Sequence, residues 1–189
     1  WVYRLKESGL AVANCHKVPQ GKFQKELLSI NEIIESIAVM ISLIKEINPT
    51  INFIFTVSPV RHIKDGFIEN QQSKAHLISA LHQIIKFHEN SFYFPSYEIM
   101  MDELRDYRFY KEDMIHPNNI AVNYIWEKLS KKWFSDETLQ TTEQIEKIQK
   151  NLDHKPFNSE SLIHEKFIKS TEQKIKKLQE KLPHIFFNY

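Results

Sequence analysis

The chain has 189 residues, 42% of them hydrophobic and 12% aromatic, which is enough apolar side chain to bury the core of one folded domain. Its 25 basic and 24 acidic residues give a formal net charge of +1, a balance that favours neither nucleic acid nor an anionic membrane as the main partner. Three scattered glycines exclude a glycine-rich phosphate-binding loop within the segment. No apolar run in the sequence is long enough for a transmembrane helix.

Cys15 is the single cysteine, so the chain cannot form an internal disulfide or a four-cysteine zinc site. A reducing compartment is the simplest interpretation, and we expect a cytoplasmic location. The sequence begins at Trp1 and not at a methionine, so a secretory signal before Trp1 stays open.

The first 50 residues predict a short irregular or hairpin-like region and then a long helix. Residues 1–19 combine an aromatic cluster with a turn at Ser8-Gly9. Ser29 and Glu32 have the spacing of a capping box, and the isoleucines that follow recur at helical intervals until about residue 48.

Two short apolar runs enclose a second amphipathic helix and predict a βαβ unit. Residues 51–59 are β-branched, aromatic and almost continuously hydrophobic, as in a parallel strand buried on both faces. A helical pattern follows at 68–89, and "SFYFPS" at 91–96 indicates a second buried strand. The order implies a parallel sheet. Because two strands are few for a compact α/β domain, we expect further strands before Trp1.

The second half of the sequence predicts a long, mostly polar connection and then helices. A connection of this length, at 95–118, is often functional in a compact domain. Helical patterns follow at 119–134, 137–152 and 160–182. We assign residues 1–135 to an α/β domain and residues 136–189 to a helical extension of that domain.

Asp113 and His116 lie in the connection, shortly after the second strand and before a helix. In open α/β sheets ligands bind outside the carboxyl ends of the strands. A carboxylate bonded to one imidazole nitrogen leaves the other nitrogen as a base for a hydroxyl nucleophile. The alternative is a surface loop that ends in a helix cap, with Pro117 or Asn118 starting the helix.

Other polar residues near the strand ends are candidates with alternatives. Ser58 could be a nucleophile, but a serine before proline is more often a turn residue that bonds the local backbone. Arg61 could hold an anionic group of a substrate or form a salt bridge, and His62 lies beside it. Cys15 and His16 are adjacent and are not expected to form a catalytic pair, although His16 remains a candidate substrate contact.

The nine histidines do not predict a metal site. His76, His82 and His88 recur every six residues on one helix, a spacing that turns roughly 240° per step and places them around the helix. We therefore expect no metal and no cofactor.

Four blocks of the sequence together resemble the bacterial GSCFA-domain family over about residues 1–165. They are "WVYRLKESGLAVANCHKVP", "TVSPVRHIKDGFIENQQSKAHL", "YFPSYEIMMDELRDYRFYKEDMIHPNNIAVNYIWEKL" and "HKPFNSES". That family is similar to the SGNH/GDSL hydrolases. The resemblance implies a three-layer α/β/α fold with a parallel sheet, incomplete at the N-terminus, followed by a C-terminal helical appendage.

The closing motif of SGNH hydrolases is Asp-x-x-His, and Asp113 to His116 matches it. The resemblance implies that His116 is the general base and Asp113 its orienting carboxylate. The family's Gly-Ser-Cys-Phe-Ala stretch, which carries the nucleophilic serine, is absent from this chain and is expected upstream of Trp1.

The resemblance therefore implies a serine ester hydrolase or O-acyl transferase that acts on a small-molecule or glycan ester, such as an acetylated carbohydrate. Residues 1–189 alone are expected to be inactive. The alternative is a non-catalytic, hydrolase-like binding or scaffold module. We expect no nucleic acid or membrane partner, and we expect self-association through an exposed sheet edge.

Overall fold

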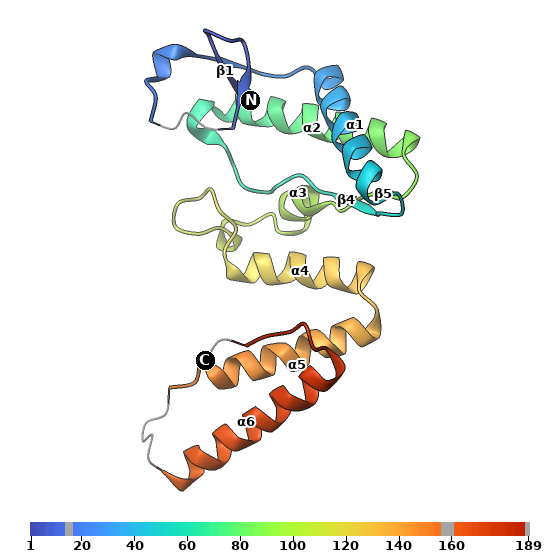
Figure 1. The fold of residues 1–189 in the computed structure, drawn as a ribbon. Helices are drawn as coiled ribbons and strands as arrows, with labels where there is room; N and C mark the ends of the chain where they lie inside the picture. The colour runs from blue at the N-terminus through green and yellow to red at the C-terminus, as the bar shows by residue number, and fades with distance from the viewer. Residues whose placement is uncertain (14–16, 156–160, 188–189) are drawn as a thin grey trace. The chain divides into compact units, whose positions relative to one another are not determined.

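The computed structural model describes residues 1–13, 17–155 and 161–187. By contacts along the chain these residues divide into two compact units, Trp1–Glu127 and Lys128–Tyr189. Figure 1 traces the chain through both units. The fold is mixed α/β, as predicted, with one antiparallel and one parallel sheet among the described residues.

The first unit holds both sheets. Its strands are β1 (Val2–Leu5), β2 (Ala11–Val12), β3 (Phe23–Glu26), β4 (Phe53–Phe55) and β5 (Ser91–Tyr93). Its long helices are α1 (Ile30–Ile47), α2 (Phe67–Phe87) and the first part of α4 (Asn119–Trp133). Its short helical turns are η1 (Gln20–Lys22), η2 (Ile63–Asp65), α3 (Ser96–Glu98), η3 (Ile99–Glu103) and η4 (Tyr107–Phe109).

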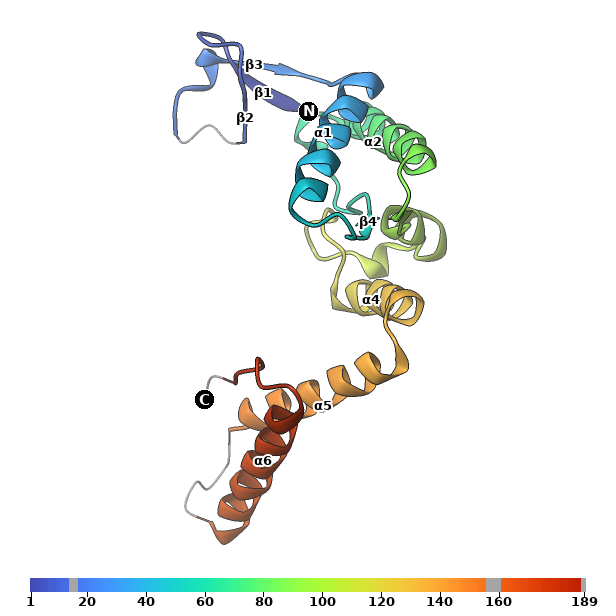
Figure 2. The same cartoon turned by 45° about the vertical axis from the view of Figure 1, so that its right-hand side comes forward.

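The N-terminal segment forms a three-stranded antiparallel sheet in the order β2-β1-β3. β1 and β2 make the predicted hairpin, with Tyr3 opposite Val12. β3, which runs beside β1 in Figure 2, was not predicted. Its sequence, Phe-Gln-Lys-Glu, has one apolar residue, so neither its hydrophobicity nor its alternation indicates a strand.

The capping box starts α1 as predicted. The Ser29 hydroxyl accepts the backbone N–H of Glu32, and the Glu32 carboxylate accepts the backbone N–H of Ser29. α1 and α2 lie side by side (Figure 1). Ile41 of α1 and Ile84 of α2 pack on Phe53 of β4, which anchors the strand to both helices.

β4, α2 and β5 form the predicted βαβ unit. The two strands pair in parallel, with Phe53 opposite Ser91 and Phe55 opposite Tyr93. The prediction of burial on both faces was wrong for β4, because Ile54 is 45% exposed while Phe53 is 8% exposed. The prediction of a buried second strand was wrong in the same way, because Phe92 of β5 is 39% exposed. Among the described residues, helices cover the face that carries Phe53 and leave Ile54 open.

The long connection after β5 is more ordered than its polarity predicted. It contains α3, the π-helix η3 and the 3-10 turn η4, and it buries Ile99, Met100 and Leu104. Ser96 at its start donates its hydroxyl to Val57 O at 2.8 Å, which fixes the connection to the end of β4. The apolar residues are too few and too irregularly spaced to predict these turns from sequence.

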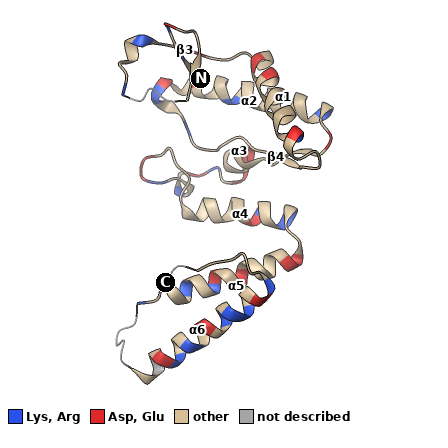
Figure 3. Cartoon of the chain, in the orientation of Figure 1, with Lys and Arg blue, Asp and Glu red and all other residues tan. Residues whose placement is uncertain are grey.

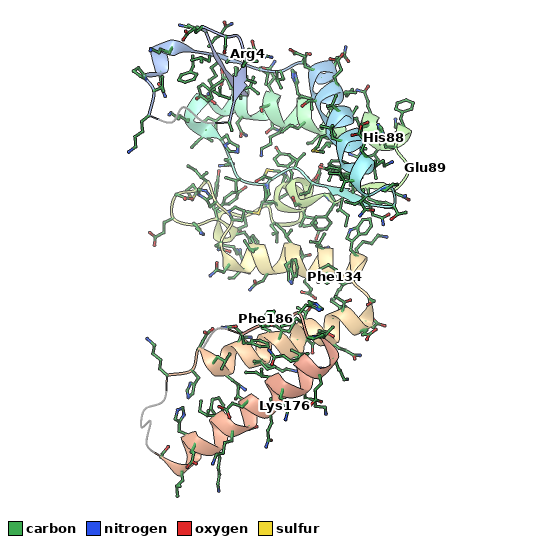
Figure 4. All side chains as sticks on the ribbon, in the orientation of Figure 1. Arg4, His88, Glu89, Phe134, Lys176 and Phe186 are labelled. Atoms are coloured by element: carbon green, nitrogen blue, oxygen red, sulfur yellow. The ribbon has the colours of Figure 1, made fainter. Side chains whose placement is uncertain are left out.

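The second unit is helical, as predicted from its charged periodic patterns. It contains α5 (Asp136–Leu152) and α6 (Leu162–Lys181), which pack through a small core of Ile148, Ile175 and Leu178. Acidic and basic residues alternate along both helices in the colouring of Figure 3. Figure 4 labels Lys176 of α6, one of the exposed lysines.

No helix in the described ranges combines the length and the apolar character that a membrane crossing requires.

The capping box gives a first testable prediction. Ser29→Ala removes the acceptor for the Glu32 backbone N–H and should lower the free energy of unfolding by about 1 kcal/mol. Chemical denaturation measures this change. Ser36→Ala is the matched control, because Ser36 is exposed inside α1 and alanine is the better helix former there. Equal effects of the two substitutions would show that the box does not stabilise the helix.

Candidate functional site

Asp113 and His116 lie in a tight hairpin loop that precedes α4. Tyr110 and Pro117 form an antiparallel bridge across its base, and Lys111 donates its backbone N–H to His116 O at 2.8 Å. Met114 at the tip has a φ of 58°, a left-handed conformation that is uncommon for a residue other than glycine. The hairpin thus brings Asp113 and His116 to the same side of the loop despite that local strain.

The Asp113 carboxylate organises the loop through three donors. Its Oδ1 accepts the backbone N–H groups of Ile115 at 2.9 Å and His116 at 3.0 Å. Its Oδ2 lies 2.7 Å from Nδ1 of His116. The backbone bonds, from His116 first and Ile115 second, lower the pKa of Asp113 to about 2, and the imidazole adds to them. Asp113 is therefore ionised across the physiological range.

The ionised carboxylate fixes how the imidazole of His116 is used. Because the Asp113 carboxylate can only accept, Nδ1 carries the hydrogen of the neutral ring. Nε2 then has a lone pair that can take a proton. Among the described residues Nε2 has no hydrogen-bond partner, and the side chain is 53% exposed. The arrangement can accept a proton from a group that approaches Nε2.

The predicted helix cap is present as well. Asn118 accepts the Ala121 backbone N–H at 3.1 Å through Oδ1, which caps α4. Its Nδ2 donates to Arg108 O at 2.6 Å, and its backbone N–H donates to Phe109 O at 2.9 Å. The two interpretations of this loop are thus compatible, because Asn118 caps the helix while Asp113 bonds His116.

Arg61 follows β4 and joins its loop to the hairpin. Its backbone N–H donates to Ile115 O at 3.2 Å, and its guanidinium lies over the Tyr110 ring at 5.1 Å. A longer contact of 3.5 Å joins its Nη1 to Met114 O. The structure therefore gives Arg61 a role in holding the hairpin, and it forms no salt bridge among the described residues.

His62 lines a cavity of about 470 Å³ at the end of β4, between the N-terminal sheet and α2. Its backbone N–H donates to Asn70 Oδ1 at 2.8 Å. His62 is exposed to solvent. Partial desolvation lowers its pKa, and the charge of Lys74 lowers it further, with a smaller contribution from His116. His62 thus lies within electrostatic range of both groups and favours its neutral form.

Ser58 behaves as the turn residue that its position before proline indicates. Its Oγ accepts the Val60 backbone N–H at 3.2 Å, and its carbonyl oxygen accepts the Lys74 ammonium. Ser58 lines the same cavity as His62. No hydrogen bond joins Ser58 to His116 in the described part of the chain.

His16 and Cys15 lie outside the described residues, so the structure does not place them. In the ranges that are described, no cluster of three histidine, cysteine or acidic side chains has metal-binding geometry.

Asn70 and Lys74 of α2, which line the same cavity as His62, were not predicted from the sequence as candidate site residues. Both are buried. With Leu77 and Leu81 they follow one face of the helix, because positions 70, 74, 77 and 81 are separated by three or four residues. Polar residues within an otherwise apolar stripe are the signal that could have found them.

Comparison with known proteins gives two family matches. The model described as the GSCFA family matches residues 1–129, and the model described as the C-terminal domain of GSCFA domain proteins matches residues 145–189. No curated protein and no solved structure matches the chain.

The geometry predicts that the pKa of Asp113 depends mainly on the backbone. His116→Ala removes the imidazole but keeps both backbone N–H donors, so the pKa of Asp113 should rise yet stay below its ordinary value of 3.8. A carbon-detected NMR titration of the carboxyl group measures it. A return to 3.8 would show that the imidazole, and not the loop backbone, holds the charge.

The lowered pKa of Asp113 also determines how its contribution to the stability of the fold changes with pH. The folded-state pKa lies below the unfolded one, so Asp113 stabilises the fold fully above about pH 4. This contribution is lost as the pH falls through about 2.

Proposed function

The chain belongs to the GSCFA family, and on this premise we propose that it carries the base and its orienting carboxylate for an SGNH-like serine ester hydrolase or O-acyl transferase. One observation carries the proposal. Asp113 bonds Nδ1 of His116 at 2.7 Å, is itself fixed by two backbone donors, and leaves Nε2 available. The same arrangement of carboxylate, imidazole and free nitrogen activates a serine in hydrolytic triads.

Each group has a distinct role in the proposed reaction. Nε2 of His116 takes the proton of the nucleophilic hydroxyl as its oxygen attacks the acyl carbonyl. The imidazolium is stabilised by the Asp113 carboxylate and then returns the proton to the leaving alcohol, which yields an acyl-enzyme. Water or an acceptor hydroxyl next gives its proton to Nε2 as its oxygen attacks the acyl carbon. The imidazolium then returns that proton to the serine oxygen as the acyl–serine bond breaks, so the protein ends unchanged.

We place the nucleophilic serine outside the printed sequence. Ser58 is engaged in a backbone turn, and its carbonyl is held by Lys74. β4 pairs only with β5 among the described residues, so its other edge is open to a further parallel strand. A strand added there would end on the same side of the sheet as His116, as the three-layer α/β/α arrangement requires.

The proposed substrate is an acyl ester, for which acetylated carbohydrates are one source. His62 lines the cavity at the end of β4 and is available to contact such a substrate. Arg61 contributes by holding the hairpin that carries His116, through Ile115 and the Tyr110 ring.

A second candidate is a hydrolase-like module that binds a ligand without catalysis. One observation favours it, since no serine, threonine or cysteine side chain bonds His116 among the described residues. Reactivity of the natural full-length protein towards a serine-directed probe separates the two candidates.

The test is labelling of the full-length protein by a fluorophosphonate, together with hydrolysis of 4-nitrophenyl acetate. His116→Ala should lower both rates by about 10²- to 10⁴-fold, because it removes the general base. His184→Ala is the matched control, since His184 is an exposed histidine of the other unit. Labelling that is equal in wild type and His116→Ala would contradict the proposal, and no labelling of wild type would support the binding module.

A further inference from the structure

Lys74 is a buried cation without an acidic partner. Its side chain projects from α2, and the residue is only 4% exposed. The ammonium donates to Ser58 O and lies over the Tyr97 ring at 5.7 Å. Within the described residues no carboxylate pairs with it, and burial alone lowers its pKa.

This environment leaves the ammonium incompletely compensated. An ammonium has three donors, and the contacts above use one hydrogen bond and one ring face. Removing a charge from water is costly unless an opposite charge and further hydrogen bonds replace the lost hydration. A neutral carbonyl and a tyrosine ring replace only part of it, so the site is suited to an additional anionic group.

The cavity beside Lys74 is basic. Lys25, Lys64 and Lys74 line it, against a single acidic lining residue, Asp65. Lys25 forms an ion pair with Asp65, so its charge is already balanced. Lys64 has no acidic partner among the described residues, but it is exposed to solvent. The buried Lys74 is therefore the positive charge of this cavity that neither an acid nor full hydration balances.

The remaining walls of the cavity suit an organic anion. Val57, Leu77 and Leu81 provide apolar surface, while Ser58, Asn70 and Ser73 provide hydrogen-bonding groups. His62 lines the cavity as well, and its pKa responds to both Lys74 and His116. Arg61, the chain neighbour of His62, donates its backbone N–H to Ile115 O at 3.2 Å, so the cavity lies beside the segment that contacts the hairpin of the proposed base. Its volume of about 470 Å³ admits a small molecule.

We propose that this cavity binds an oxyanion, a carboxylate or phosphate group of the substrate, through the ammonium of Lys74. The oxyanion supplies the missing counter-charge and accepts an N–H hydrogen of Lys74 that Ser58 O does not take. The identification of this oxyanion as part of the substrate rests on the proposed ester chemistry. The binding of the oxyanion itself does not.

Binding is tested on the natural full-length protein with simple probes. Inorganic phosphate and acetate are titrated separately, with sodium chloride at equal ionic strength as the reference, and the melting temperature is followed. At least one oxyanion should raise the melting temperature above the chloride reference. A response to phosphate alone identifies a phosphate group, and a response to acetate alone identifies a carboxylate.

Two variants of Lys74 and one control locate the effect. Lys74→Gln keeps a donor for Ser58 O but removes the charge, and Lys74→Met removes both. Each should abolish the oxyanion-specific shift. Without ligand, Lys74→Met should fold with little loss of stability, since an uncompensated buried charge is removed. Lys86→Gln, at an exposed position in the last turn of the same helix, should keep the shift.

A substrate pair separates this inference from the proposed function. Lys74→Gln should lower kcat/KM for 4-nitrophenyl hemisuccinate, which carries a carboxylate, about tenfold more than for neutral 4-nitrophenyl acetate. An oxyanion shift that survives in Lys74→Gln, or no shift in wild type, would overturn the anion site. An oxyanion shift without His116-dependent hydrolysis would instead overturn the proposed ester chemistry.

Discussion

The candidate site depends on the Asp113 carboxylate, which gathers three N–H donors in four residues. Two donors come from the backbone of Ile115 and His116, and the third is the imidazole of His116. The backbone bonds fold the hairpin and lower the pKa of Asp113, while the third bond orients the ring. The same side chain thus holds the loop conformation and orients the imidazole so that Nε2 is exposed. Its hydrogen bonds also help to offset the left-handed backbone of Met114 at the tip.

The segment from Thr56 to His62 connects this hairpin with the basic cavity. The Ser58 carbonyl accepts the buried ammonium of Lys74, and Arg61 donates its backbone N–H to Ile115 O. Both features therefore rest on the chain that leaves the carboxyl end of β4, where α/β folds place their ligands.

Local signals in the sequence predicted much of the fold. The capping box at Ser29, the isoleucine spacing of α1 and the apolar runs of β4 and β5 each depend on neighbouring residues, which a sequence shows directly. β3 could not be predicted, because its polar residues become a strand only by pairing with β1. Asp113 and His116, in contrast, are only three residues apart, so the sequence alone predicted them as a pair. The environment of Lys74 arises from Ser58 and Tyr97, which lie far from it in sequence.

We propose that Nε2 of His116 serves a nucleophile that residues 1–189 do not contain. An experimental structure of the natural full-length protein tests it most directly. We expect a serine Oγ within about 3.2 Å of Nε2, on a strand that pairs with the unpaired edge of β4, while Asp113 keeps its bond to Nδ1. A structure in which Nε2 faces solvent or a non-nucleophilic group, with no serine in reach, would contradict it.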